Sequence, residues 1–151
     1  MIRSETKGFH RLYYSMKKQP QSIERLVVLE VGWVVRQMSK DIRKTWQPHQ
    51  KTRELHNSIF RDMWKSGQNI IGQVYSTAKH SIFMEEGTKK HTIRAKNKPF
   101  LVFQINGQWI KVKKVKHPGT SAVPAFRLAM IKFGRGFPRR LAGKIKARFY
   151  K

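Results

Sequence analysis

The dipeptide Asn106-Gly107 lies between two runs in which apolar and polar residues alternate. A two-residue type I′ turn needs positive φ at both loop positions, and asparagine followed by glycine meets that need, so the pattern predicts a β-hairpin. The turn also sets the register, because residues that flank a two-residue loop must face each other. One face of the hairpin is then apolar and is expected to belong to the core: Leu101, Phe103, Ile105, Ile110 and Val112.

The opposite face of this hairpin mixes large apolar groups with ammonium groups. It carries Phe100, Val102, Gln104, Trp109, Lys111 and Lys113. Apolar groups that cannot all be buried inside one domain are typical of a surface that binds another protein. We therefore predict that the interface with another subunit or a partner includes Phe100, Val102, Trp109, Lys111 and Lys113.

The segment from Gln21 to Thr45 is predicted to form one long helix. Apolar residues recur in it at intervals of three and four: Ile23, Leu26, Val27, Val31, Val34, Met38 and Ile42. Val28, Leu29, Trp33 and Val35 widen the apolar arc, which indicates a helix covered on two sides. A sheet would cover one side, and either a neighbouring subunit or a helix of the same chain would cover the other. Trp33 is therefore a further candidate interface residue.

The remaining elements complete an α+β pattern. We expect a strand at Met1–Lys7, a helix at Phe9–Lys18, strands at Ser58–Lys65 and Asn69–Ser76, helical turns at Ala78–Glu86 with Ile82 and Phe83 buried, a basic extended run at Lys89–Lys98, and a helix from Pro124 that Gly134 and Gly136 interrupt. This order predicts an antiparallel or mixed sheet packed on one long helix, with short flanking helices and a basic C-terminal tail. The expected domain is 1–133, and 134–151 is a basic extension.

The C-terminal extension has two parallel patterns. Leu141, Ile145 and Phe149 recur every four residues, and Arg140, Lys144 and Arg148 keep the same interval one position earlier. The segment is either a helix with an apolar stripe beside a basic one or a frayed solubilising tail.

Positive charge is concentrated in the second half of the chain. The formal net charge is +25, all eight acidic residues lie at or before Glu86, and the 65 residues after it contain eighteen Lys or Arg. Such an excess favours association with an acidic protein, a nucleic acid or an anionic membrane; a merely solvated basic face is the alternative. The candidate contacts to an acidic partner or to DNA are Lys89, Lys90, Arg94, Lys96, Arg139, Arg140, Lys144 and Arg148.

The sequence contains no pattern typical of catalysis or metal binding. It has no cysteine, and no two of its six histidines are three or four residues apart. Phosphate-loop, dinucleotide and nucleophile-elbow motifs are missing, and no apolar run approaches the ~18 residues of a membrane-spanning helix. We therefore expect no catalytic residue, no cofactor, no metal and no membrane partner.

Five short motifs follow one another in a specific order: EEGT from Glu85, IRAKN from Ile93, FLVF from Phe100, VKHPGT from Val115 and PAFRLA from Pro124. Together they resemble the neck and tail-completion proteins of tailed bacteriophages. A weaker resemblance to the same family extends upstream, to Lys7-Gly8-Phe9 and to the segment Leu55–Ile59. Arg53 stands where the family usually has glycine. The chain beyond Gly134 is not covered by the resemblance.

The resemblance implies a non-catalytic virion protein at the junction of head and tail, assembled in the host cytoplasm as a homo-oligomeric ring, commonly a hexamer. Neighbouring neck, head-completion or tail-tube proteins would be its partners, with transient contact to genomic DNA in the channel. The motif turns, which would orient the hairpin, are Glu86, Gly87, Thr88, His117, Pro118 and Gly119. The alternatives are a basic nucleic-acid-binding module in which Phe100 and Trp109 stack on bases, and a membrane-active tail from Pro138.

Overall fold

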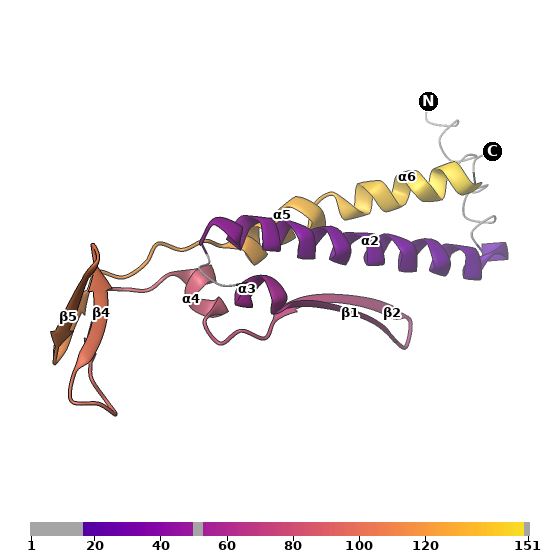
Figure 1. Cartoon of the computed structure of the whole chain (residues 1–151). Coiled ribbons are helices and arrows are strands. Elements are labelled where there is room, and N and C mark those ends of the chain that lie inside the picture. Colours follow the sequence, from indigo (N-terminus) through magenta and orange to yellow (C-terminus); the bar gives the residue numbers. More distant parts are fainter. Residues whose placement is uncertain (1–16, 50–52, 150–151) are drawn as a thin grey trace. The chain divides into compact units, whose positions relative to one another are not determined.

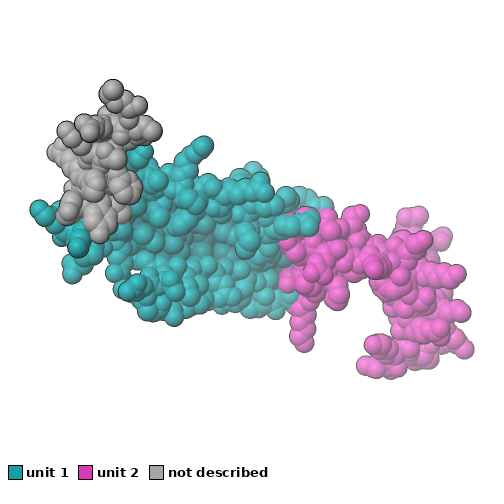
Figure 2. Space-filling view, turned by 180° about the vertical axis from the view of Figure 1, so that it is seen from behind, with its two compact units in different colours: residues 1–78, 125–151 teal, residues 79–124 magenta. Residues whose placement is uncertain are grey.

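The computed structural model describes residues 17–49 and 53–149 (Figure 1). The strand predicted at Met1–Lys7 lies outside the described residues, as does the helix predicted at Phe9–Lys18 except for its last two residues. The described chain forms two compact units, which Figure 2 colours separately. We call Met1–Ala78 with Ala125–Lys151 the helical unit, and Lys79–Pro124 the hairpin unit.

The helical unit is organised around helix α2 (Pro20–Trp46). Pro20 occupies the first turn, where its missing N–H costs nothing, and Arg43 and Lys44 lie in the last turn, where cations complement the helix dipole. Strands β1 (Ile59–Ser66) and β2 (Asn69–Ser76) pack on one side of α2, and helices α5 (Ala125–Gly134) and α6 (Phe137–Phe149) on the other (Figure 1). The predicted two-sided cover is confirmed, and helices of the same chain form the second side.

Strands β1 and β2 form an antiparallel hairpin around Gly67, which has the positive φ that its turn requires. The pairing places Ile59 opposite Ser76 and Met63 opposite Gly72. Gly72 permits a close approach to α2, because a Cβ there would lie 2.7 Å from Cγ1 of Val31. The β1–β2 sheet therefore packs on α2 at Gly72, the one position of these two strands that has no side chain.

The core of the helical unit lies near the end of α2. Its buried apolar residues are Val35, Ile42, Trp46, Leu55, Ile59, Ala78, Ala125 and Ala129. The ring of Trp46 meets that of Phe126 edge to face, with centroids 5.4 Å apart. A short 3₁₀ turn, η1 (Gln47–His49), and helix α3 (Glu54–Asn57) close this end, and the Arg43 guanidinium donates to the carbonyl oxygens of His56 and Ile59 at 3.1 and 2.5 Å. Arg43 therefore satisfies carbonyl groups where the chain enters β1.

The hairpin unit contains helix α4 (Ser81–Glu86) and two antiparallel ribbons. Strand β3 (His91–Arg94) pairs with β6 (Lys114–His117), and β4 (Leu101–Ile105) pairs with β5 (Gln108–Val112). The sequence does not predict β6, in which a single valine alternates with basic residues. Strand β6 follows β5 after the one-residue bend at Lys113, so the two ribbons share a nearly continuous strand.

The α+β class is confirmed, and every strand pair in the described residues is antiparallel. The strands form three two-stranded sheets. The C-terminal segment is helical as α6, with Leu141, Ile145 and Phe149 half-buried, so the helix is confirmed over the frayed tail. None of the helices in residues 17–49 and 53–149 combines the length and the apolar character of a membrane span.

Candidate partner-binding surface

The β4–β5 hairpin has the register that the Asn106-Gly107 turn predicts. Asn106 and Gly107 have φ of 49° and 84°, and Phe103 pairs with Ile110. On the outer face, Trp109 is 74% exposed and Val102 is 59% exposed. Apolar groups this exposed lose contact with water only when another molecule covers them.

Two further residues of the outer face contact each other. The Lys111 ammonium lies 4.5 Å from the centre of the Phe100 ring, a cation–π contact. Lys113 is exposed at the bend between β5 and β6. The structure therefore places Val102, Trp109 and Lys111 on one face of the hairpin, with Phe100 in contact with Lys111.

The sequence predicts that the inner face of the hairpin belongs to the core, and this prediction is wrong because the residues on that face are not fully buried. Leu101 and Phe103 are only half-buried, and Ile105 is exposed. Together with Ile93 and Val115 of the neighbouring ribbon they line an open groove of about 590 Å³. The hairpin unit, with one short helix and two ribbons, leaves this face without a second layer, so alternation predicts which residues share a face but not how far they are buried.

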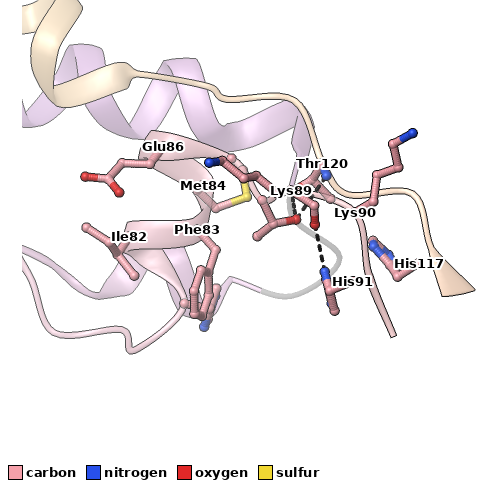
Figure 3. Close-up of a pocket in the computed structure, with 12 residues that line it drawn as sticks. Ile82, Phe83, Met84, Glu86, Lys89, Lys90, His91, His117 and Thr120 are labelled. Atoms are coloured by element: carbon pink, nitrogen blue, oxygen red, sulfur yellow. Dashed lines mark hydrogen bonds between the residues drawn. The ribbon is translucent and has the colours of Figure 1, made fainter. Parts of the chain in front are cut away.

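Helix α4 provides a second apolar surface. The prediction that Ile82 and Phe83 are buried is wrong, since they are 49% and 57% exposed. Both residues line an open cavity of about 740 Å³ together with Met84, and Figure 3 draws the three side chains around α4. Every residue of Lys79–Pro124 is described, and none of them is buried.

The two motif turns, about thirty residues apart in sequence, meet in the hairpin unit. Thr88 and Thr120 form a β-bridge in which each backbone N–H donates to the other's carbonyl oxygen, at 3.0 and 3.1 Å. Gly87 and Gly119 both have positive φ, and a Cβ on Gly87 would lie 2.6 Å from the Thr120 carbonyl oxygen. Glycine is therefore required at both turns for conformation and for close backbone approach. Glu86 and Pro118, the remaining turn residues, are exposed.

Two histidines pair across β3 and β6. His91 faces His117, with ring centroids 5.0 Å apart. The Gly119 N–H donates to Nδ1 of His117 at 3.1 Å, which requires this nitrogen to be unprotonated, while Nδ1 of His91 lies 2.8 Å from the Lys89 carbonyl oxygen. His117 thus fixes the second motif turn through the turn's own backbone.

The basic candidates divide into exposed and internally paired residues. Lys89, Lys90, Arg94, Lys96, Arg139 and Arg148 are exposed. Arg140 and Lys144 instead bind Glu30 of α2, at 2.7 and 2.5 Å. These two predicted partner contacts are therefore engaged within the chain.

Glu30 is an acidic residue within the apolar arc of α2, and it is 1% exposed. Burial by itself raises the pKa of its carboxyl group, but hydrogen bonds and charge from Lys144 and Arg140 outweigh burial, so the pKa lies below its usual value. The sequence carries the signal for this site, since one carboxylate in the apolar arc of α2 needs a partner and the extension offers cations four residues apart.

Trp33, the interface candidate on α2, contacts the C-terminal helices of its own chain. The Arg140 guanidinium lies 3.9 Å from the centre of its ring, and Phe133 meets it edge to face at 6.1 Å. Trp33 is 39% exposed, so these contacts leave part of its side chain open to solvent.

The helical unit also exposes an aromatic face that the sequence did not indicate. Alternation along β1 and β2 places Phe60, Trp64, Ile71 and Tyr75 on the side away from α2, where Phe60 stacks on Tyr75 with centroids 5.9 Å apart. A hydrogen bond with Asp62 raises the pKa of Tyr75. This face spans only the two strands β1 and β2, and no further layer among the described residues covers it.

Across residues 17–49 and 53–149, no three His, Cys, Asp or Glu side chains are grouped as metal ligands. No protein-family model, curated protein or solved structure matches this chain.

Proposed function

We propose that the protein is a structural, non-catalytic virion subunit that forms a homo-oligomeric ring in the neck or tail-completion complex of a tailed bacteriophage. The observation that carries the proposal is the hairpin unit, whose 46 residues include no buried side chain. The motifs that resemble this family support it, because the first four lie entirely in that unit and the fifth begins at its last residue, Pro124.

The physical reason is that a unit this small cannot stabilise itself without a core. Domains of about 60 residues are already marginal, and smaller ones usually need disulfides, metals or association. The chain has no cysteine, and the hairpin unit exposes Val102 and Trp109 on one surface and Ile82 and Phe83 on another. Packing against other subunits would supply the cover that the described residues of the hairpin unit do not provide for one another.

The ring also needs acidic neighbours. The hairpin unit contains ten Lys or Arg and two Glu, a formal net charge of +8, and none of the ten forms an ion pair with a described residue. Identical subunits repel each other at this charge unless partner proteins or DNA neutralise it. The basic surface therefore faces acidic neck or tail proteins, or the genome in the channel.

The second candidate function is single-stranded nucleic-acid binding, and one observation favours it. Trp109 is the most exposed large apolar side chain described and lies on the same face as Lys111. An aromatic ring beside ammonium groups can stack on a base while the cations bind phosphate. That function predicts sub-micromolar binding whose affinity falls steeply with salt.

The test is assembly of a Trp109→Asp variant. Light scattering should show a ring for the wild type and a smaller species for the variant, with the circular dichroism of the helices unchanged. Gln108→Asp is the matched control, since Gln108 is exposed on the other face of the same hairpin. A complete ring from Trp109→Asp would contradict the proposed interface.

A further inference from the structure

The cavity beside α4 has an apolar floor, which offers a polar ligand few hydrogen-bonding groups. Ile82, Phe83 and Met84 contribute it, and the pocket is lined largely by apolar surface (Figure 3). Covering an exposed phenylalanine removes apolar surface from water and so stabilises a complex. The floor therefore suits aliphatic or aromatic side chains of an incoming molecule.

The rim of the same cavity is basic. Lys89 and Lys90 lie on it with exposed side chains, and His91 and His117 lie on it side by side. Glu86 is the one carboxylate among the lining residues. Neither lysine forms an ion pair with a described residue, so both ammonium groups are open to an acidic ligand.

We propose that this groove binds a segment of a partner protein in which apolar side chains alternate with carboxylates. The inference rests on the proposed function for the identity of the partner, a neighbouring virion protein. Apolar side chains fill the floor beside Phe83, and the carboxylates pair with Lys89 and Lys90 on the rim. The bridge between Thr88 and Thr120 holds the rim in place, because Lys89 follows directly after Thr88 in the chain.

Other occupants fit the groove less well. A second copy of this chain carries a net charge of +25 and so meets the basic rim with like charge. A nucleic acid would satisfy the two lysines but would leave the aliphatic groups of Ile82 and Met84 against polar backbone. The combination of an apolar floor with a basic rim favours a peptide that is both apolar and acidic.

The probe is a fluorescein-labelled eight-residue peptide in which Leu or Phe alternates with Asp or Glu, titrated with the full chain. A second peptide carries Asn and Gln in place of the acids. The acidic peptide should bind at least about tenfold more tightly than the neutral one at low salt, and the difference should shrink as salt rises. Equal affinity for the two peptides would overturn the proposal.

Variants locate the site. Phe83→Ser should weaken binding of the acidic peptide about tenfold, and Phe83→Leu should retain most of it. The double variant Lys89→Glu with Lys90→Glu should weaken it at least as much, whereas Lys146→Glu on α6 is the charge control and should change it little. Because all these side chains are exposed, the circular dichroism spectrum should be unchanged.

Two further outcomes would overturn the inference: unchanged affinity in Phe83→Ser, or displacement of the peptide by a thymidine oligonucleotide. Ring assembly of the wild-type chain, measured separately by light scattering, distinguishes the two proposals. A wild-type ring that does not bind the acidic peptide removes the groove assignment and leaves the proposed function standing. A chain that binds the peptide but never assembles removes the proposed function and leaves the groove assignment standing.

Discussion

Glu30→Gln should destabilise the helical unit more than any other single loss of charge on α2. The carboxylate is 1% exposed and binds two cations of α6, Arg140 at 2.7 Å and Lys144 at 2.5 Å. Glutamine keeps the shape and one acceptor oxygen but removes the charge. It therefore leaves both cations of α6 without their counterion.

The size of the stability loss in Glu30→Gln depends on how far Arg140 and Lys144 are exposed to solvent. Breaking a fully buried ion pair from one side costs about 3–5 kcal/mol. The side chains of Arg140 and Lys144 are 32% and 52% exposed, so water can solvate their charge after the substitution. A hydrogen bond to a charged group contributes about 1.5–3 kcal/mol, and we expect a loss of about 2 kcal/mol in the free energy of unfolding.

The assay is urea denaturation followed by circular dichroism, with Glu24→Gln as the matched control. Glu24 binds Lys65 at 2.5 Å, but both side chains are about half exposed, and such surface pairs contribute about 0–1 kcal/mol. The same substitution thus tests a buried and an exposed carboxylate. Equal losses for the two variants would refute the assignment of Glu30 as the anchor of α6.

The difference between wild type and Glu30→Gln should depend on pH. The pKa of Glu30 is lowered in the folded protein, so its stabilisation is fully present above the unfolded-state value of about 4.3 and is lost as the pH falls through the lower folded value. The two proteins should therefore converge in stability below about pH 4. A constant difference down to pH 2 would contradict the ionic role.

Three glycine substitutions test the packing. Gly72→Ala should cost about 1–3 kcal/mol in urea denaturation, because the new Cβ would meet Cγ1 of Val31 and of Val35 at 2.7 and 2.9 Å, and no loss would contradict the close packing of β2 on α2. Gly119→Ala should make the hairpin unit susceptible to proteolysis, since its φ is 93° and it faces backbone atoms; resistance equal to wild type would count against the bridge between the motif turns. Gly143→Ala should raise the free energy of unfolding by about 0.5–1 kcal/mol, because the position is in α6 with open space around it, and a lower thermal midpoint would show that α6 does not form.

Local patterns predicted the elements well. The long helix, the two hairpins and the interruption near Gly134 lie within a few residues of their predicted positions, and the β4–β5 register is as predicted. These features depend on turn chemistry and periodicity, which are properties of neighbouring residues.

Burial was harder to predict, because it depends on what other segments cover. Phe83 has the apolar character of a core residue, yet no layer of the hairpin unit lies over it. Glu30 has the character of a surface residue, yet α6 covers it and supplies its counterions. The contact between Thr88 and Thr120 is a pairing over 32 residues and leaves no periodic signal in the sequence.

The most direct test of the central claim is hydrogen–deuterium exchange of Lys79–Pro124 as a function of protein concentration. A unit without a buried side chain should exchange its amides rapidly in dilute, monomeric protein. Protection of β4 and β5 should then rise together with the mass measured by light scattering, as subunits cover Trp109. Strong protection of this unit in a monomer, at every concentration, would contradict the claim that assembly completes the fold.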